Sequence, residues 1–312
     1  MKTYVLYHYP CPDGTAAAMA ALLAFRDDVV YVPTNYGKEV PIPDNSLVYF
    51  VDFSWPRKDL DELVSRGCSV VVLDHHKTAA EALAGVEKCD PNAIPSPGLR
   101  AVFDMSKSGA RIAWEFFHPG HPIPWLIKLV EDRDIWKWEY NAENPGKPGG
   151  DTAAFAAWLK MQEPTPVRYA EINGWIEQGG ANGGMDLISI LSAGRLLLEA
   201  EAANVEVLAK KAFWTKIGEH RVVAANAPIL QSEVGHALLE KQPQSPFSAV
   251  FSYAEDEQGQ LMERWSLRGR GDFDVSAIAK QFPGGGGHFS AAGFSVPSLM
   301  VEVAVPVPSG VS

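Results

Sequence analysis

The first half of the chain alternates short apolar runs with longer segments of helical composition. The segments at 15–25 and 57–66 are rich in Ala, Leu and charged residues, as helices commonly are. The apolar runs carry many β-branched residues and predict buried strands; they lie at 3–7, 29–32, 47–51 and 70–73. Strands that alternate with helices predict an α/β fold on a mostly parallel sheet with right-handed crossovers.

The pattern changes further along the chain. A glycine-rich run at 179–184 follows the last helices of the first half, and an apolar helical pattern then continues to about residue 214. Beyond it, short apolar runs and helical segments alternate again. A length of 312 residues suits two domains. We therefore expect a parallel-sheet N-terminal domain at 1–184 with flanking helices, a long connector helix at 185–214, and a smaller mixed α/β domain at 215–312.

Composition narrows the classes of function. The net charge of −11 disfavours a protein that grips long duplex nucleic acid, because such proteins need a basic face. A short anionic substrate is favoured instead. The three cysteines, Cys11, Cys68 and Cys89, show neither a disulfide framework nor a Cys-x-x-Cys pair. With no signal sequence and no apolar stretch of about 18 residues, the sequence predicts a cytoplasmic protein with no membrane partner.

Polar residues follow three of the predicted strands. His8, Asp52 and the Asp-His-His run at 74–76 each come directly after a strand, and Asp13 lies in the turn after the first. Taken singly, solvation explains each of them, and helix capping explains Asp13. In an open parallel sheet, however, ligands bind at the carboxyl ends of the strands. Imidazoles and carboxylates gathered there predict a transition-metal site that requires no thiolate.

A second acidic group ends the apolar helix predicted at 123–130. This cluster, at 131–134, is either a surface charge network or the source of a last metal ligand, since an apolar helix directs it inward. Trp136 and Trp138 follow it. Core packing is the commoner role for tryptophans in such a place, whereas an exposed ring there could stack on a base.

Four consecutive glycines, 284–287, precede His288 near the end of the chain. A run of this kind suits neither a helix nor a strand interior. Its backbone N–H groups can approach a ligand closely and form an anion nest. A flexible linker is the alternative, but a linker would not continue into Ala291-Ala292-Gly293 and a last strand. We therefore interpret the run as a phosphate-binding segment.

Taken together, these motifs resemble those of the DHH phosphoesterase family over nearly the whole chain. The first motif is similar to His8 with Cys11-Pro-Asp13-Gly14, the second to Asp52, the third to the Asp-His-His run, and the fourth to Asp132. The second domain resembles the glycine-rich substrate domain of the family. There the matching residues are Ser266-Leu-Arg268, the run from Gly284 to His288, and Ala291-Ala292-Gly293.

The resemblance implies a role for each matching residue. The implied ligands of divalent metal, usually Mn²⁺, are His8, Asp13, Asp52, His75 and Asp132. Asp74 would orient its neighbours and His76 would contact the scissile phosphate, so that Asp74, His75 and His76 form the catalytic group. The distal part of the substrate would be held by Arg268, Gly285, Gly286, Gly287 and His288.

Two departures from the family pattern concern an additional carboxylate near Asp13. Some members carry a second Asp two residues after it, where this chain has Thr15, and others carry one two residues before it, where this chain has Cys11. The spacing from His8 to Asp13 is also one residue longer than usual. We therefore expect that one of two metal sites is weak, or that Asp134 completes it.

The resemblance implies a hydrolase in which metal-activated water cleaves phosphoester bonds of short oligonucleotides, dinucleotides or nucleotide phosphates. A pyrophosphate or polyphosphate hydrolase is the alternative enzyme. A non-catalytic nucleotide-binding module with an incomplete metal site is the alternative of another class. The sequence leaves open the exact substrate, exo- or endonucleolytic action, the number of metal ions and whether the chain forms a homodimer.

Overall fold

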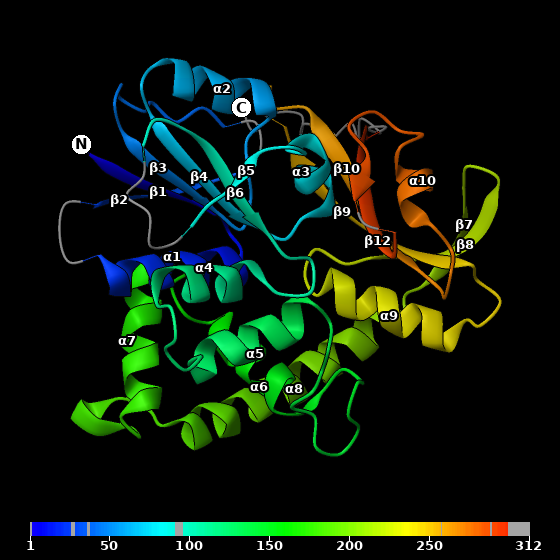
Figure 1. Ribbon diagram of the computed structural model, residues 1–312. Coiled ribbons are helices and arrows are strands. Elements are labelled where there is room, and N and C mark those ends of the chain that lie inside the picture. Colours follow the sequence, from blue (N-terminus) through cyan, green and yellow to red (C-terminus); the bar gives the residue numbers. More distant parts are fainter. Residues whose placement is uncertain are drawn as a thin grey trace, which may run out of the picture. The chain divides into compact units, whose positions relative to one another are not determined.

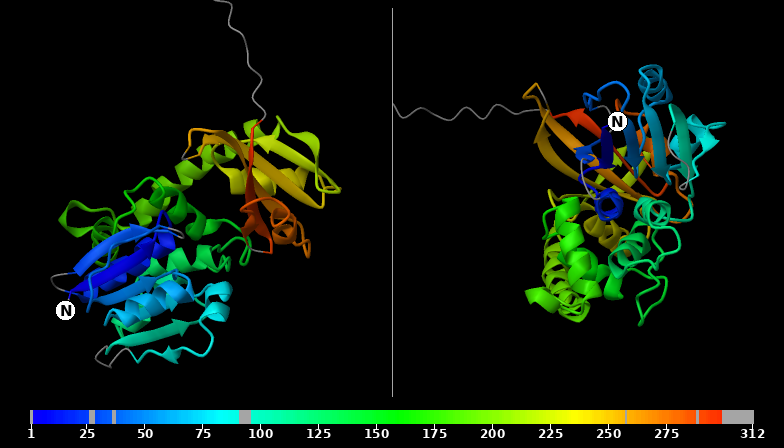
Figure 2. Two further views of the ribbon diagram at one scale, coloured as in Figure 1. Left: turned by 90° about the horizontal axis from the view of Figure 1, so that it is seen from above. Right: turned by 60° about the vertical axis from the view of Figure 1, so that its left-hand side comes forward.

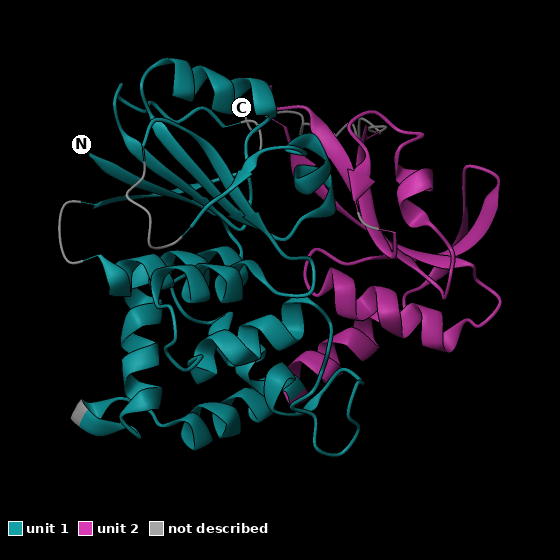
Figure 3. Cartoon of the chain, viewed as in Figure 1, with its two compact units in different colours: residues 1–198 teal, residues 199–312 magenta. Residues whose placement is uncertain are grey.

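The computed structural model describes residues 2–25, 29–35, 38–90, 96–256, 258–287 and 289–298. The chain divides into two compact units, residues 1–198 and residues 199–312, coloured separately in Figure 3. Unit 1 holds the predicted strands with polar ends, and unit 2 holds the glycine run.

Unit 1 is built on a six-stranded parallel sheet, with the strand order β2-β1-β3-β4-β6-β5. Its strands are β1 (Thr3–His8), β2 (Val29–Thr34), β3 (Leu47–Val51), β4 (Ser69–Asp74), β5 (Glu87–Lys88) and β6 (Gly98–Phe103). The predicted parallel α/β architecture is confirmed. The apolar pattern did not predict β5 and β6, which are the last two strands on one side of the sheet.

Helices cover both faces of this sheet (Figure 1; Figure 2). Alternate strand residues point to opposite faces, so Val5 packs in a core with α1 (Pro12–Ala24) and α4 (Gly109–Phe117). Leu6 packs on the other face with α2 (Arg57–Ser65). Because both faces are covered, every residue of β4 is buried.

Further helices of unit 1 extend the core on the α1 face: α5 (Trp125–Asp134), α6 (Gly150–Leu159), α7 (Pro166–Glu177) and the first part of α8 (Leu187–Ala209). The short helix α3 (Lys77–Ala82) buries no residue, and the 3₁₀ helix η1 spans Ala181–Gly183. Helix α5 continues through the acidic cluster instead of ending before it. Acidic and basic residues do not break a helix, so the predicted end at residue 130 is four residues short.

Unit 2 contains a mixed six-stranded sheet in the order β11-β12-β10-β9-β8-β7. Among its described strands, only β8 and β9 pair in parallel. The elements are β7 (Phe213–Ile217), β8 (His220–Asn226), α9 (Gln231–Lys241), β9 (Phe247–Glu255), β10 (Leu261–Gly269), α10 (Val275–Ala279), β11 (Gly286–Gly287) and β12 (Ala291–Pro297). The predicted mixed α/β composition of this part is confirmed.

The long helix α8 is present, although it is shorter at both ends than the predicted connector at 185–214. The division into compact units falls inside it, after residue 198. The predicted limits of three separate parts therefore stay a prediction. None of the described helices combines the length and apolar character needed to cross a bilayer.

Candidate metal centre

Three neighbouring strands deliver polar side chains to one edge of the unit 1 sheet. Tyr7 of β1 pairs with Val51 of β3, which pairs with Leu73 of β4. The next residue along each strand is therefore His8, Asp52 or Asp74. The parallel register alone explains why residues far apart in the sequence meet here.

Asp52 stands at the middle of this group. Its carboxylate is buried, and neither oxygen has a hydrogen-bond partner among the residues that the structure describes. Two imidazole nitrogens lie beside it: His8 Nδ1, 3.4 Å from Oδ2, and His75 Nε2, 3.3 Å from Oδ1. Burial would raise the pKa of Asp52, but its interactions with His75 and His8 outweigh burial and hold the pKa well below its usual value.

The backbone is strained where Asp52 lies. Its φ of +65° is in the left-handed region, which non-glycine residues seldom adopt and which clusters at functional sites. Gly109, at the start of α4, lies so close that a Cβ there would be 2.6 Å from the Asp52 Cβ. Glycine at 109 is thus needed for Asp52 to take this position.

His75 Nε2 lies among three carboxylates. It is 3.3 Å from Asp52 Oδ1, 3.5 Å from Asp134 Oδ2 and 3.8 Å from Asp13 Oδ2. Burial and the nearby charges of Asp52 and Asp134 raise the pKa of Asp13 well above its usual value. Burial and Asp52 raise the pKa of Asp134 to about 6. So many negative groups crowded together produce a site that a cation would stabilise.

Asp13 is held by another helix rather than by its own. Its carboxylate accepts hydrogen bonds from Gly109 N at 2.6 Å and Ala110 N at 3.0 Å, at the start of α4. The residue at the N-cap of α1 is Cys11, so the capping explanation for Asp13 is not what the structure shows. The bonds to α4 fix the carboxylate beside His75.

Asp132, the predicted fourth-motif ligand, is not brought to this group; Asp134 is. The Asp132 carboxylate accepts hydrogen bonds from Glu139 N at 2.7 Å, Tyr140 N at 3.4 Å and the Thr152 hydroxyl. Two residues turn a helix by about 200°, so Asp132 and Asp134 point to opposite sides of α5. Asp132 instead organises the turn after α5.

Asp74 and His76 form a pair beside the cluster. Oδ1 of the fully buried Asp74 accepts hydrogen bonds from His75 N at 2.7 Å and His76 N at 3.2 Å, and it lies 2.7 Å from His76 Nδ1. The bond to Asp74 raises the pKa of His76 and outweighs burial, which would lower it. This geometry suits the orienting role that the resemblance implies for Asp74.

These side chains form three groups in which ligand atoms lie within 4.8 Å of one another: His8, Cys11 and Asp52; Asp52, His75 and His76; and Asp13, His75 and Asp134. Asp52 and His75 each belong to two groups. Carboxylate and imidazole donors around a buried, unsatisfied carboxylate fit divalent transition metals. The sequence had assigned no ligand role to Cys11.

The predicted residues of unit 2 have mainly structural contacts in this structure. Arg268, on β10, donates hydrogen bonds to Ser266 Oγ at 3.0 Å and Leu267 O at 2.8 Å. Gly286 and Gly287 form the two-residue strand β11 at the edge of the sheet, so the run does not form a strand interior. A Cβ on Gly285 would lie 1.9 Å from Ala279 O, and one on Gly287 2.6 Å from Ala292 Cα. His288 lies outside the described residues.

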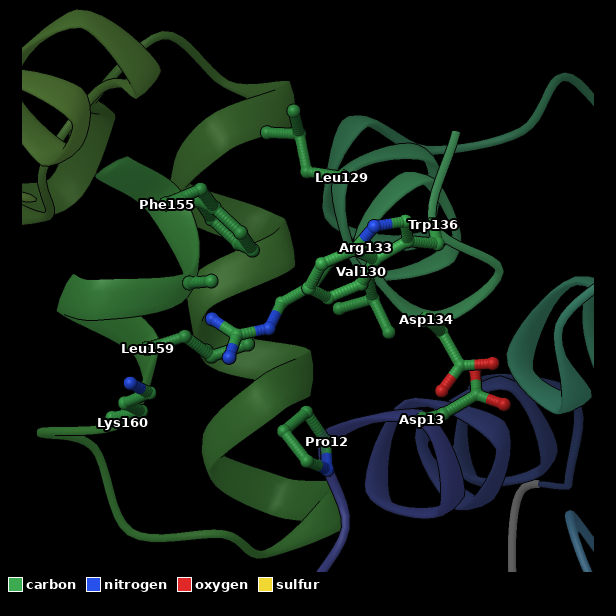
Figure 4. Close-up of a pocket in the computed structure, with 11 residues that line it drawn as sticks. Pro12, Asp13, Leu129, Val130, Arg133, Asp134, Trp136, Phe155, Leu159 and Lys160 are labelled. Atoms are coloured by element: carbon green, nitrogen blue, oxygen red, sulfur yellow. The ribbon is translucent and has the colours of Figure 1, made fainter. Parts of the chain in front are cut away.

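A cavity of about 390 Å³ adjoins this group of candidate metal ligands through Asp13 and Asp134. Helices α5 and α6 form most of its walls. Figure 4 shows the two carboxylates together at one side, and the Arg133 side chain extending toward Leu159 and Lys160. The cavity therefore combines apolar walls with acidic and basic groups, as small-ligand sites do.

The two tryptophans after α5 differ in exposure. Trp138 is only 3% exposed and packs in the core, whereas Trp136 is 52% exposed and lines the cavity. Both have positive φ angles, and backbone N–H groups of the turn donate to the Asp132 carbonyl, from Lys137 at 2.9 Å and from Trp138 at 3.4 Å. The expected core role thus holds for Trp138, and Trp136 is the ring that can meet a ligand.

Two relatives match most of this chain. Uncharacterized protein R106 of Acanthamoeba polyphaga mimivirus is 29% identical over 93% of the chain, which spans 66% of that protein, just under two thirds. Oligoribonuclease NrnB of Bacillus subtilis (strain 168) is 25% identical over 97% of the chain and 75% of its own length. No family model matches the chain.

Two of the solved structures that resemble this chain are more distant from it. One is a pGpG-specific phosphodiesterase, PggH, of Vibrio cholerae, at 14% identity, with 95% of this chain and 93% of that chain covered and a TM-score of 0.41. The other is an exopolyphosphatase-related protein of Bacteroides fragilis, at 13% identity, with 96% and 87% covered and a TM-score of 0.41. Neither likeness bears on the assignment of the site.

Proposed function

We propose that this chain, which fits the DHH phosphoesterase family, is a metal-dependent phosphoesterase that hydrolyses phosphoester bonds of short oligonucleotides, dinucleotides or nucleotide phosphates. The observation that carries the proposal is the buried carboxylate of Asp52, set between His8 and His75 with neither oxygen hydrogen-bonded within the described part of the chain. A buried carboxylate needs a positive partner, and a metal ion held with His8 and His75 would supply one.

The residues that would hold divalent metal are those that the strand ends and α5 bring together. They are His8, Asp13, Asp52, His75 and Asp134, the last in place of Asp132. Mn²⁺ suits this set of oxygen and imidazole donors. When bound, divalent metal supplies Lewis acidity, which activates water and offsets charge on the phosphoryl oxygens.

His76 is the residue that we assign to the scissile phosphate. Asp74 fixes the orientation of its ring and raises its pKa, so the imidazole is favoured in the protonated form. A protonated imidazole held at a fixed angle can donate a hydrogen bond to a phosphoryl oxygen whose charge grows in the transition state. Without the Asp74 carboxylate, the His76 ring would remain at the site, but its orientation would no longer be fixed.

A nucleotide is favoured over pyrophosphate by the cavity next to the cluster. Trp136 offers an exposed ring at its wall, and a ring of this kind stacks on bases of any sequence. Inorganic pyrophosphate has no base to place there. The curated relative NrnB is named an oligoribonuclease, which agrees with a short nucleic acid substrate.

The test is a panel of substrates hydrolysed with and without Mn²⁺: a linear dinucleotide, a five-residue RNA, a nucleoside bisphosphate, bis-p-nitrophenyl phosphate and pyrophosphate. Wild type is compared with His75→Ala and with the control His121→Ala, whose ring lies on an exposed turn after α4. We expect Mn²⁺-dependent turnover of the dinucleotide or RNA, lost in His75→Ala and kept in His121→Ala. Pyrophosphate as the fastest substrate would replace the nucleotide assignment, and nucleotide binding without turnover of any substrate would indicate a binding module.

A further inference from the structure

Cys11 lies just before α1, in a turn where the neighbouring polar groups already form hydrogen bonds. It follows β1 and forms the N-cap of α1, with extended backbone angles and a side chain that makes no cap hydrogen bond. Its carbonyl oxygen accepts hydrogen bonds from Thr15 N at 2.9 Å and Thr15 Oγ1 at 2.8 Å. Thr15, where some family members carry an acid, is therefore buried and committed to holding this turn.

The thiol of Cys11 faces the sheet edge rather than a core. Its Sγ, a nitrogen of His8 and a carboxylate oxygen of Asp52 all lie within 4.8 Å of one another. The other two cysteines are buried in the hydrophobic cores, Cys68 on the α2 side of the sheet and Cys89 on the α1 side. Cys11 is thus the cysteine whose position gives it chemically useful neighbours.

A second observation indicates that a cation would be stabilised between these three side chains. The Asp52 side chain is only 2% exposed, and its oxygens lack hydrogen-bond partners among the described residues although they point at the group. A carboxylate desolvated in this way is stabilised by metal coordination. The thiol, the imidazole and the carboxylate together provide three donors of different types around one point.

We propose that Cys11 Sγ is a metal ligand, which with His8 and Asp52 completes a cation site of mixed sulfur, nitrogen and oxygen donors. The proposal rests on the metal-dependent function proposed above. A thiolate favours borderline-soft ions such as Zn²⁺ or Co²⁺ over Mn²⁺. Three protein ligands also leave a fourth position open, which is the arrangement of catalytic rather than structural zinc sites.

The neighbouring group differs in its donors. Asp13, Asp134 and His75 supply two carboxylates and an imidazole, with Asp52 between the two groups, and such oxygen-rich sites suit Mn²⁺ or Mg²⁺. The chain would therefore hold two unlike ions, one at each group. The carboxylate that seemed to be missing next to Asp13 is replaced by a thiolate, not lost.

Cobalt provides a direct test, because a thiolate bound to Co²⁺ gives a charge-transfer absorption in the near ultraviolet that carboxylate and imidazole ligands do not give. The whole chain is titrated with Co²⁺ while the spectrum and the number of bound ions are recorded. The variants are Cys11→Ser and Cys11→Asp, with Cys68→Ala and Cys89→Ala as controls. Ser and Asp are both favourable N-cap residues, so α1 should keep its start.

We expect wild type, Cys68→Ala and Cys89→Ala to show the thiolate band, and both Cys11 variants to lack it. Cys11→Ser should bind the ion of this site at least about tenfold more weakly, which is about 1.4 kcal/mol. Cys11→Asp should regain metal binding while its preference moves from Zn²⁺ toward Mn²⁺. Circular dichroism checks that each variant is folded.

Two other results would overturn the assignment. Stoichiometric Co²⁺ binding in wild type with no thiolate band would show a carboxylate and imidazole site without Cys11, and would leave the proposed hydrolysis intact. A band that disappears in Cys68→Ala or Cys89→Ala instead would assign the thiolate elsewhere. Failure of wild type to bind Co²⁺, Zn²⁺ or Mn²⁺ at all would instead contradict the metal-dependent function itself.

Discussion

His75 Nε2 lies 3.5 Å from the carboxylate of Asp134, which α5 carries into the cluster from outside the sheet. The other members of the cluster come from strand ends or from the start of α1. Asp134 therefore brings a carboxylate from helix α5 to the residues at the strand ends. Asp132, two residues earlier, accepts hydrogen bonds from the turn that follows α5.

The first prediction separates the two acids of α5. Asp134→Asn should lower metal affinity by at least about 100-fold and reduce turnover accordingly, because a ligand is lost. Asp132→Asn should instead destabilise the fold by about 1–3 kcal/mol, because buried hydrogen bonds to the turn and Thr152 are weakened. Metal titration and urea unfolding of both variants make the comparison. Loss of metal in Asp132→Asn at unchanged stability would restore the original assignment.

The second prediction concerns the glycine that makes room for Asp52. In Gly109→Ala the new Cβ would meet Asp52 Cβ at 2.6 Å, so the carboxylate must move and both metal affinity and activity should fall by tenfold or more. Gly174→Ala in α7 is the matched control, since its Cβ would meet only Gln178 Nε2 at 3.8 Å. The control should gain about 0.5–1 kcal/mol of stability from helix propensity. Full activity in Gly109→Ala would show that the contact is unimportant.

The third prediction is a pH dependence of metal-free stability. Burial and Asp52 raise the pKa of Asp134 to about 6. Burial would lower the pKa of His75, but Asp52 and Asp134 raise it above its usual value. Raised folded-state pKa values contribute stability that is present at low pH and lost as pH rises through them. The pKa of Asp52 is lowered, so its contribution has the opposite sign and is lost only in acid.

Between about pH 4 and pH 7 the raised groups dominate, and metal-free protein should become less stable as pH rises. Bound metal removes the repulsion among the carboxylates. The increase in Tm caused by Mn²⁺ should therefore be larger near pH 7.5 than near pH 5, which thermal scans at fixed ionic strength will measure. An equal increase at both pH values would contradict the assigned crowding.

The fourth prediction distinguishes the two tryptophans. Trp136→Ala should weaken binding of a dinucleotide by about 1–3 kcal/mol through lost stacking, without changing the hydrolysis of bis-p-nitrophenyl phosphate. Trp136→Phe should keep most of the dinucleotide affinity. Trp138→Ala should mainly reduce stability, by about 3–5 kcal/mol, since its ring is buried in the core. An unchanged KM for the dinucleotide in Trp136→Ala would exclude the stacking role.

The strand-end residues were accessible from sequence because two simple rules determine them. Apolar runs identify buried strands, and parallel strands place their following residues at one edge, so His8, Asp52 and His75 could be grouped without coordinates. The fold class follows from the same alternation. The motifs also resembled those of one family, and two relatives match most of the chain at 25% and 29% identity.

The features that the sequence did not predict depend on which side of a helix a residue faces and on tertiary contacts. The sequence named Asp134 as a residue that could complete a metal site, but choosing it over Asp132 requires the rotation of α5, and the predicted helix ended before either residue. Placing Cys11 beside Asp52 requires the extended backbone of Cys11 before α1 and the positive φ of Asp52, next to which position 109 has no room for a Cβ. For the glycine run, close packing against Ala279 and Ala292 supplies a reason for glycine that composition alone did not reveal.

The central claim is that Asp52 binds divalent metal and that hydrolysis depends on it. The most direct measurement is the metal content and the Mn²⁺-dependent turnover of a linear dinucleotide, compared between wild type and Asp52→Asn at equal folded concentration. We predict that Asp52→Asn loses the bound metal and at least about 100-fold in turnover. An Asp52→Asn protein that keeps both its metal and its activity would contradict the account.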